Sequence, residues 1–139
     1  MKRLITTLVA SLLAATQPAL SQPGIQQQQV QFKHGETGAR LKGRLEGDQT
    51  IDHTLTAGAG QTLRIQLAPS NASDCFNLLP PGSDEAIHIG SSASNDFAGA
   101  LKTGGTHAIR VYLMRNAARR NENTTDTLDV GTSGAVKQP

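Results

Sequence analysis

The sequence is poor in aromatic residues and in cysteine. It has no tryptophan, one tyrosine, three phenylalanines and a single cysteine, Cys75. An internal disulfide is therefore excluded, and a folded core has to consist mainly of aliphatic side chains. We interpret Cys75 as a small buried strand residue, with a reactive or cross-linking thiol as the alternative.

Signatures of enzymes and metal sites are also missing. The four histidines, His34, His53, His88 and His107, are scattered without the spacing of metal ligands. The serine-rich stretch 91–94 lacks the glycines of a nucleophile elbow, and no phosphate-binding loop or dinucleotide fingerprint occurs. The sequence therefore predicts a non-catalytic protein without a metal or a cofactor.

Only one long hydrophobic run is present, at the N-terminus. The basic residues Lys2 and Arg3 precede an apolar run at 4–15. Ala19-Leu20-Ser21 then has the small-x-small form of a signal peptidase site. The run is too short for a membrane span, so we expect residues 1–21 to be a signal peptide that is cleaved near Ser21. This predicts a periplasmic or secreted protein without a transmembrane anchor.

Cleavage of the signal peptide changes the charge balance. The whole chain has 13 basic and 11 acidic residues, and two of the basic ones, Lys2 and Arg3, leave with the signal. The mature chain is then formally neutral, whereas nucleic-acid binding usually leaves a basic footprint on the domain. We therefore expect no nucleic-acid partner.

Hydrophobic residues alternate with polar ones through most of the remaining chain. Ile109, Val111 and Leu113 alternate with Arg110 and Tyr112, which predicts a strand with one core face and one outer face. At such an outer position, replacement of Arg110 should change stability little. Glycine and proline turns separate eight or nine runs of this kind, near residues 30–33, 40–45, 52–56, 62–68, 75–79, 86–89, 98–101, 106–114 and 125–130.

Many short strands without a helical apolar stripe predict an all-β protein, an antiparallel β-sandwich with a jelly-roll-like arrangement. We expect this domain at residues 30–131. The glutamine-rich residues 22–29 have no periodic apolar face and are expected to be a flexible lead-in. Residues 132–139 are expected to be a flexible tail.

Positive charge gathers in one long connection between two strands. Ten residues, 115–124, join strands that would pair, whereas hairpin loops usually have two to five. Arg115, Asn116, Arg119 and Arg120 lie here and could form one helical turn with Asn116 as its cap. An arginine fork binds a carboxylate through two parallel hydrogen bonds, although it also suits phosphate or an acidic glycan.

Three interpretations of this connection follow from the residues alone. It could bind carboxylates on a partner, it could be an inert surface loop, or its arginines could serve a DNA breaking-rejoining enzyme with Tyr112 as nucleophile. The signal peptide and the neutral mature chain disfavour the enzyme. Asp84 and Glu85 follow a Pro-Gly turn and form a solvated turn or a candidate binding rim.

Several segments together resemble the periplasmic inhibitors of goose-type (g-type) lysozyme. They are VQFKHG at 30–35, KGRLEG at 42–47, AGQ at 59–61, PPG at 80–82, and GTHAIRV at 105–111 followed by RNAAR at 115–119. The last is the most specific. A looser likeness links the chain to the sandwich domains of secreted proteases. Two departures are His53 and His107, where the family pattern favours an aromatic strand residue.

The resemblance implies a β-sandwich that inhibits a g-type lysozyme by placing loops in its cleft. Arg115, Asn116 and Arg119 match the family motif residue by residue, and Arg120 extends the positive patch. Such a cleft contains carboxyl groups that act on a polysaccharide. The alternative is an envelope-binding or accessory domain for an acidic glycan or another protein.

Overall fold

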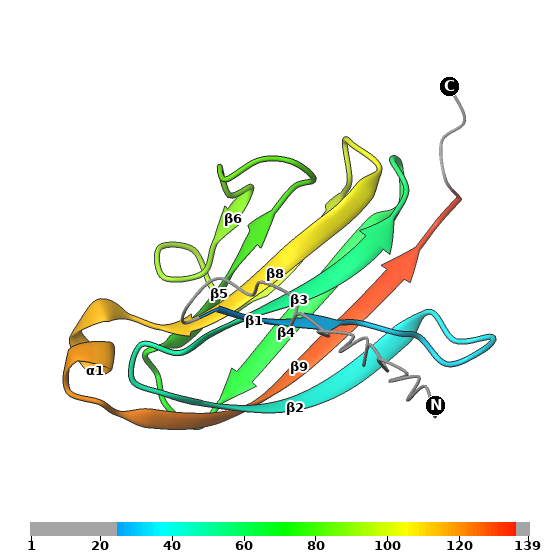
Figure 1. Cartoon of the computed structure of the whole chain (residues 1–139). Coiled ribbons are helices and arrows are strands. Elements are labelled where there is room, and N and C mark those ends of the chain that lie inside the picture. Colours follow the sequence, from blue (N-terminus) through cyan, green and yellow to red (C-terminus); the bar gives the residue numbers. More distant parts are fainter. Residues whose placement is uncertain (1–24, 136–139) are drawn as a thin grey trace, which may run out of the picture.

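Two β-sheets pack face to face in the structure, a computed structural model that describes residues 25–135 (Figure 1). The signal peptide expected at 1–21 lies outside the described residues. The nine strands and one short helix are β1 (Ile25–Gln29), β2 (Gly38–Glu46), β3 (Thr50–Ala57), β4 (Thr62–Pro69), β5 (Asp74–Leu79), β6 (His88–Ile89), β7 (Asp96–Ala100), β8 (Gly105–Leu113), α1 (Arg115–Arg119) and β9 (Asn123–Ser133).

Sheet A has the strand order β1-β3-β8-β5-β6, and sheet B has the order β2-β9-β4-β7. All pairings are antiparallel except that of β1 with β3, which is parallel. The predicted all-β sandwich is confirmed. Within residues 25–135, no helix has the length and apolar character needed to cross a membrane.

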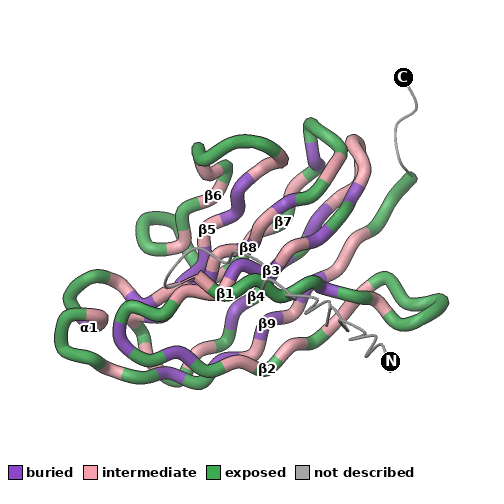
Figure 2. The backbone as a smooth tube through the Cα atoms, viewed as in Figure 1, coloured by how far each residue is buried: buried purple, intermediate pink, exposed green. Residues whose placement is uncertain are grey.

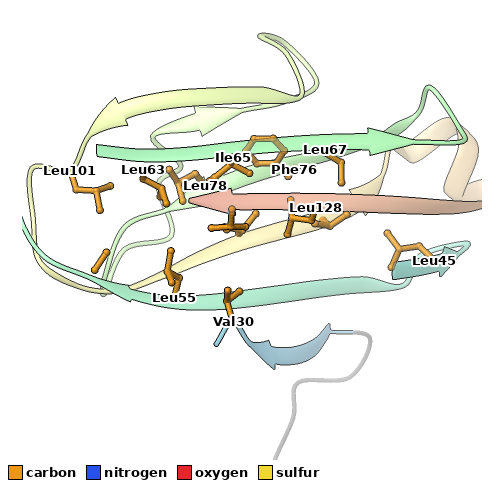
Figure 3. Packing of buried hydrophobic residues seen from close by; sticks show 14 residues of the cluster. Val30, Leu45, Leu55, Leu63, Ile65, Leu67, Phe76, Leu78, Leu101 and Leu128 are labelled. Atoms are coloured by element: carbon orange, nitrogen blue, oxygen red, sulfur yellow. The ribbon is translucent and has the colours of Figure 1, made fainter. Parts of the chain in front are cut away.

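The core between the sheets is almost wholly aliphatic, as the composition requires (Figure 3). Phe76 is its one fully buried phenylalanine. Ile109, Val111 and Leu113 on β8 are buried, which confirms the predicted register of this strand. Cys75 is free and buried, also as predicted.

Two predictions near the N-terminus are wrong. Ile25–Gln29, expected to be a flexible lead-in, forms β1 and pairs with β3 from Ile25↔Thr50 to Gln29↔Thr54. The pairing uses backbone groups at a sheet edge, so it needs no apolar pattern in the side chains. Residues 30–33 are not a strand, although Val30 is buried in the core.

Other boundaries shift by a few residues. β9 extends to Ser133, so the first two residues of the expected tail pair with β4. The strand expected at 86–89 contains only His88 and Ile89, and that expected at 98–101 lies at Asp96–Ala100. These errors fall at strand ends, where turn residues carry little hydrophobic signal.

We predict that Val111→Asp unfolds the domain, because it places an unpaired carboxylate between the sheets. Ala98→Asp is the matched control, since Ala98 is an exposed position of β7 opposite Arg64. Circular dichroism melting should show a cooperative transition near that of wild type for the control and none for Val111→Asp. Similar melting of the two variants would contradict the assigned faces of β8.

Candidate functional site

The arginine segment, defined as residues 115–120, lies at one end of the sandwich (Figure 1). Its first five residues form α1. Met114 occupies the N-cap position without a side-chain hydrogen bond, so Asn116 is not the cap that the sequence suggested. The turn closes through the backbone, since the Ala118 amide donates to the Met114 carbonyl at 3.0 Å.

One side of α1 faces the protein and the other faces solvent (Figure 2). Ala117 is fully buried and anchors the helix. Arg115, Asn116 and Arg119 are exposed. Because Arg115 and Arg119 are four residues apart in a helix, their side chains leave from the same side.

The three arginines differ in their partners. The Arg120 guanidinium binds the Glu122 carboxylate at 2.6 Å, so its charge is largely compensated within the chain. Neither Arg115 nor Arg119 forms an ion pair with any described residue. The segment therefore offers two uncompensated positive charges.

A turn at residues 70–74 bonds to both ends of the arginine segment. The Met114 amide donates to the Ser73 carbonyl at 2.8 Å, directly before α1. The Asn71 side-chain amide donates to Glu122 Oε1 at 3.0 Å and to the Asn123 carbonyl at 3.2 Å, directly after the segment. These hydrogen bonds thus fix the position of the arginine segment at both of its ends.

A second turn, between β2 and β3, supports the same end. The Gly47 amide donates to the Glu122 carbonyl at 2.8 Å, and the Asn121 side chain donates to Glu46 at 3.2 Å. Gly47 has φ +62°, and a Cβ there would lie 2.5 Å from Asn121 Oδ1. Glycine is therefore required for this close approach.

Beneath the arginine segment lies a buried polar cluster that the sequence analysis missed. Asp74 has 0% of its surface exposed, and its Oδ2 accepts a 3.0 Å hydrogen bond from the Thr124 hydroxyl. Burial, with a smaller contribution from a hydrogen bond to Asp126, raises the pKa of Asp74 to about 8. Asp126 lies two and four residues before Leu128 and Val130 on β9, so the period-two alternation could have predicted that it faces the core.

Asp84 and Glu85 lie away from the arginine segment. They follow Pro81, which lies against Gly105 at the start of β8, the end of that strand opposite to α1. Both are exposed. The structure thus does not bring the candidate rim together with the arginines.

Tyr112 lies on the outer face of sheet A rather than in an open site. Its hydroxyl donates to Asn77 Oδ1 at 2.9 Å. Burial, followed by a hydrogen bond with Cys75, raises the pKa of Tyr112. A phenol held protonated in this way is poorly suited to be a nucleophile.

Arg110 is also committed within the chain. Its Nε and Nη2 bind Asp52 at 2.7 and 2.9 Å, and the Asp52 residue is only 5% exposed. The sequence placed Arg110 correctly on the outer face, and its contact with buried Asp52 leads us to replace the expectation that its loss matters little with the opposite prediction. Its removal would leave a buried carboxylate without a partner.

His53 and His107 face the interior, and burial lowers the pKa of both. Among the described residues, no group of three or more His, Cys, Asp or Glu side chains could hold a metal ion. The exposed arginines are therefore the chemistry that this end of the molecule presents.

Comparison with known proteins finds relatives of this chain, although no family model matches it. The crystal structure of Aeromonas hydrophila PliG, a periplasmic inhibitor of g-type lysozyme, superposes with a TM-score of 0.73 and 36% sequence identity. The match covers 78% of this chain and 97% of that one. This chain belongs to the family of g-type lysozyme inhibitors.

A second inhibitor of g-type lysozyme, from Escherichia coli K12, is 28% identical over 104 residues, which are 73% of this chain and 77% of that protein. The pre-peptidase C-terminal domain of a Bacillus anthracis collagenase shares the fold alone, with a TM-score of 0.51 and 14% identity over 78% of this chain and 94% of that domain. The inhibitor family shares the fold with this protease domain.

We predict that Arg110→Gln lowers the free energy of unfolding by about 2–4 kcal/mol, because Asp52 stays buried without its counter-charge. Arg40→Gln is the matched control. Arg40 binds Asp129 at 2.8 Å, but the two side chains are 70% and 40% exposed, so its loss should cost about 0–1 kcal/mol. Urea denaturation measures both values, and equal losses would contradict the structural role of Asp52.

We also predict that Asp74 makes stability fall as pH rises. The folded chain keeps this proton to about pH 8, whereas the unfolded chain releases it near the ordinary pKa of 3.8. The stabilisation is therefore complete below pH 4 and is lost as pH approaches 8. Between pH 5 and 8, wild type should lose about 2–4 kcal/mol relative to Asp74→Asn.

The comparison with Asp74→Asn removes a contribution of opposite sign. His53 and His107 have lowered pKa values, so they stabilise the fold less as pH falls below 6.5. Both are present in wild type and variant alike, and their contributions cancel in the difference. Urea denaturation at each pH measures it, and a constant difference would exclude a proton on buried Asp74.

Proposed function

We propose that this protein is a periplasmic inhibitor of g-type lysozyme and that Arg115 and Arg119 bind carboxyl groups of the enzyme's cleft. Family membership supports the activity, since the relatives are inhibitors and not enzymes. The main support for the site is the pair of exposed arginines that lack ion partners within the described chain.

The charge and the shape of the arginine segment suit such a cleft. Glycosidases generally act through acidic groups that flank the scissile bond. A guanidinium can bind a carboxylate through two parallel hydrogen bonds. Because α1 protrudes from one end of the sandwich, it can enter a cleft while the two sheets stay outside (Figure 1).

The hydrogen bonds that fix the arginine segment also favour its binding to the lysozyme. Backbone and side-chain bonds from the 70–74 turn hold both ends of α1, and Ala117 is buried beneath it. A segment that is ordered before binding loses less conformational entropy when the complex forms. Arg120, which already binds Glu122, would serve mainly this ordering.

We predict that Arg115→Ala and Arg119→Ala each weaken inhibition of a g-type lysozyme at least about 30-fold. This corresponds to the lower end of the 2–5 kcal/mol lost when a charge-assisted contact is removed from a desolvated interface. Arg120→Ala should have a smaller effect, because Glu122 already compensates its charge. Titration of inhibitor against lytic activity measures each constant.

Two control variants separate the site from the scaffold. Arg40→Ala removes an exposed arginine of sheet B, and Tyr112→Phe removes a hydroxyl bonded to Asn77. Both should inhibit almost as wild type does. Full inhibition by Arg115→Ala and Arg119→Ala would overturn the arginine site. Failure of folded wild type to inhibit any g-type lysozyme would overturn the function and favour an envelope ligand such as an acidic glycan.

A further inference from the structure

The buried cluster beneath the arginine segment consists of three polar residues within the hydrophobic core, Asp74, Thr124 and Asp126. Asp74 on β5 accepts a hydrogen bond from Thr124 on β9, and Asp126, two residues further along the same face of β9, is close enough to raise the pKa of Asp74. Asp126 is only 8% exposed. Gly43 makes room for it, since a Cβ there would lie 2.8 Å from Asp126 Oδ1.

One oxygen of each carboxyl group has no other partner. Asp74 Oδ1 and Asp126 Oδ2 are buried and accept no hydrogen bond from any described donor. A single proton between these oxygens would satisfy both. Without it, two buried carboxylates would face each other across the sandwich, which like-charge repulsion and desolvation strongly disfavour.

Within residues 25–135, no cation forms an ion pair with either acid. From β3, His53 is close enough to interact with Asp126, and burial lowers the pKa of His53 below its ordinary value of 6.5, so it is neutral at pH 7. Cys75, next to Asp74, has a raised pKa and is also neutral. The paired positions on the other neighbouring strands carry no charge, because Gly43 of β2 and Pro69 of β4 lie beside Asp126 and Leu113 of β8 lies beside Asp74.

The same residues form the mechanical base of the arginine segment. Asp74 ends the 70–74 turn, and its amide donates to the Asn71 carbonyl at 3.0 Å. The Ser70 amide donates to the Thr125 carbonyl at 2.8 Å, and the Thr125 amide donates to the Ser70 hydroxyl oxygen at 2.9 Å. The buried Asp74–Thr124 hydrogen bond therefore fastens the turn to β9 from inside, while the turn bonds to Met114 and Glu122 on the outside.

We propose that a proton shared by Asp74 and Asp126 acts as a clamp that orders the arginine segment, so that the segment is rigid in acid and loosens as the pH rises past neutrality. Loss of the proton drives the start of β5 away from β9. The bonds of the 70–74 turn to Met114, Glu122 and Asn123 then break more often.

The clamp itself does not depend on the proposed partner, whereas its effect on inhibition rests on the proposed function. Apparent affinity falls with the fraction of molecules in the binding-competent state. An inhibitor in the periplasm would then bind most tightly under acidic conditions. Order of the segment and potency of inhibition can be measured separately, so either statement can fail alone.

Amide hydrogen exchange of the full mature chain tests the clamp directly. After correction for the intrinsic pH dependence of exchange, protection of residues 115–122 in wild type should fall about 10-fold between pH 5.5 and 8.5. Asp74→Asn should show no such fall, because an asparagine amide donates to Asp126 without titrating. Asp129→Asn, an acid of β9 on the outer face, should behave as wild type.

Constant protection in wild type, or equal falls in wild type and Asp74→Asn, would overturn the clamp. If Asp74→Asn does not fold, Asp126→Asn removes the same shared proton and should also abolish the pH dependence. Carbon-13 NMR of the wild-type Asp74 carboxyl gives a check without mutation. An Asp74 already ionised at pH 5.5 would overturn the proposal.

The effect on function is measured as a ratio of inhibition constants. For one g-type lysozyme, the inhibition constant of wild type, divided by that of Asp74→Asn, should rise about 3- to 10-fold between pH 5.5 and 8.5. The ratio cancels the pH dependence of the enzyme. A constant ratio despite the expected change in exchange would confine the clamp to the scaffold and overturn its regulatory role. Absence of inhibition by either protein would instead count against the proposed function.

Discussion

The attachment of the 70–74 turn to the start of β9 is the contact on which the functional end of this protein depends. It joins sheet A to sheet B through the buried Asp74–Thr124 hydrogen bond and through the outer bonds of Ser70 and Asn71. Both ends of the arginine segment bond to this junction. The position of two exposed arginines therefore follows from a polar contact in a mainly aliphatic interior.

That arrangement relates stability to function in an unusual way. Polar groups buried at one end of a sandwich destabilise it unless each has a partner. Here Thr124 donates to one oxygen of Asp74, while a second oxygen of Asp74 and one of Asp126 have no partner among the described residues, and the proposed shared proton supplies it. On the outer face of sheet A, the buried Asp52 carboxylate is instead stabilised by the opposite charge of Arg110, which needs no added proton. The two devices should respond differently to pH.

Family membership and physical reasoning contribute different parts of the functional conclusion. The relatives establish the fold and the family, and they support the proposed activity. The local structure distinguishes the arginines, since Arg120 is compensated by Glu122 while Arg115 and Arg119 are not. It also separates Asp84 and Glu85 from that site, because the register of β5 with β8 places their turn toward the other end of the sandwich.

The sequence by itself determined the fold class, the core face of β8 and the candidate arginines, because period-two alternation and local charge are properties of neighbouring residues. It could not reveal β1, whose glutamines pair through backbone atoms alone. Only the tertiary structure decided that Asp52 meets Arg110 and that Asp74 meets Thr124, since these partners lie 58 and 50 positions apart. Contacts of such separation arise from strand order and register, which no local pattern encodes.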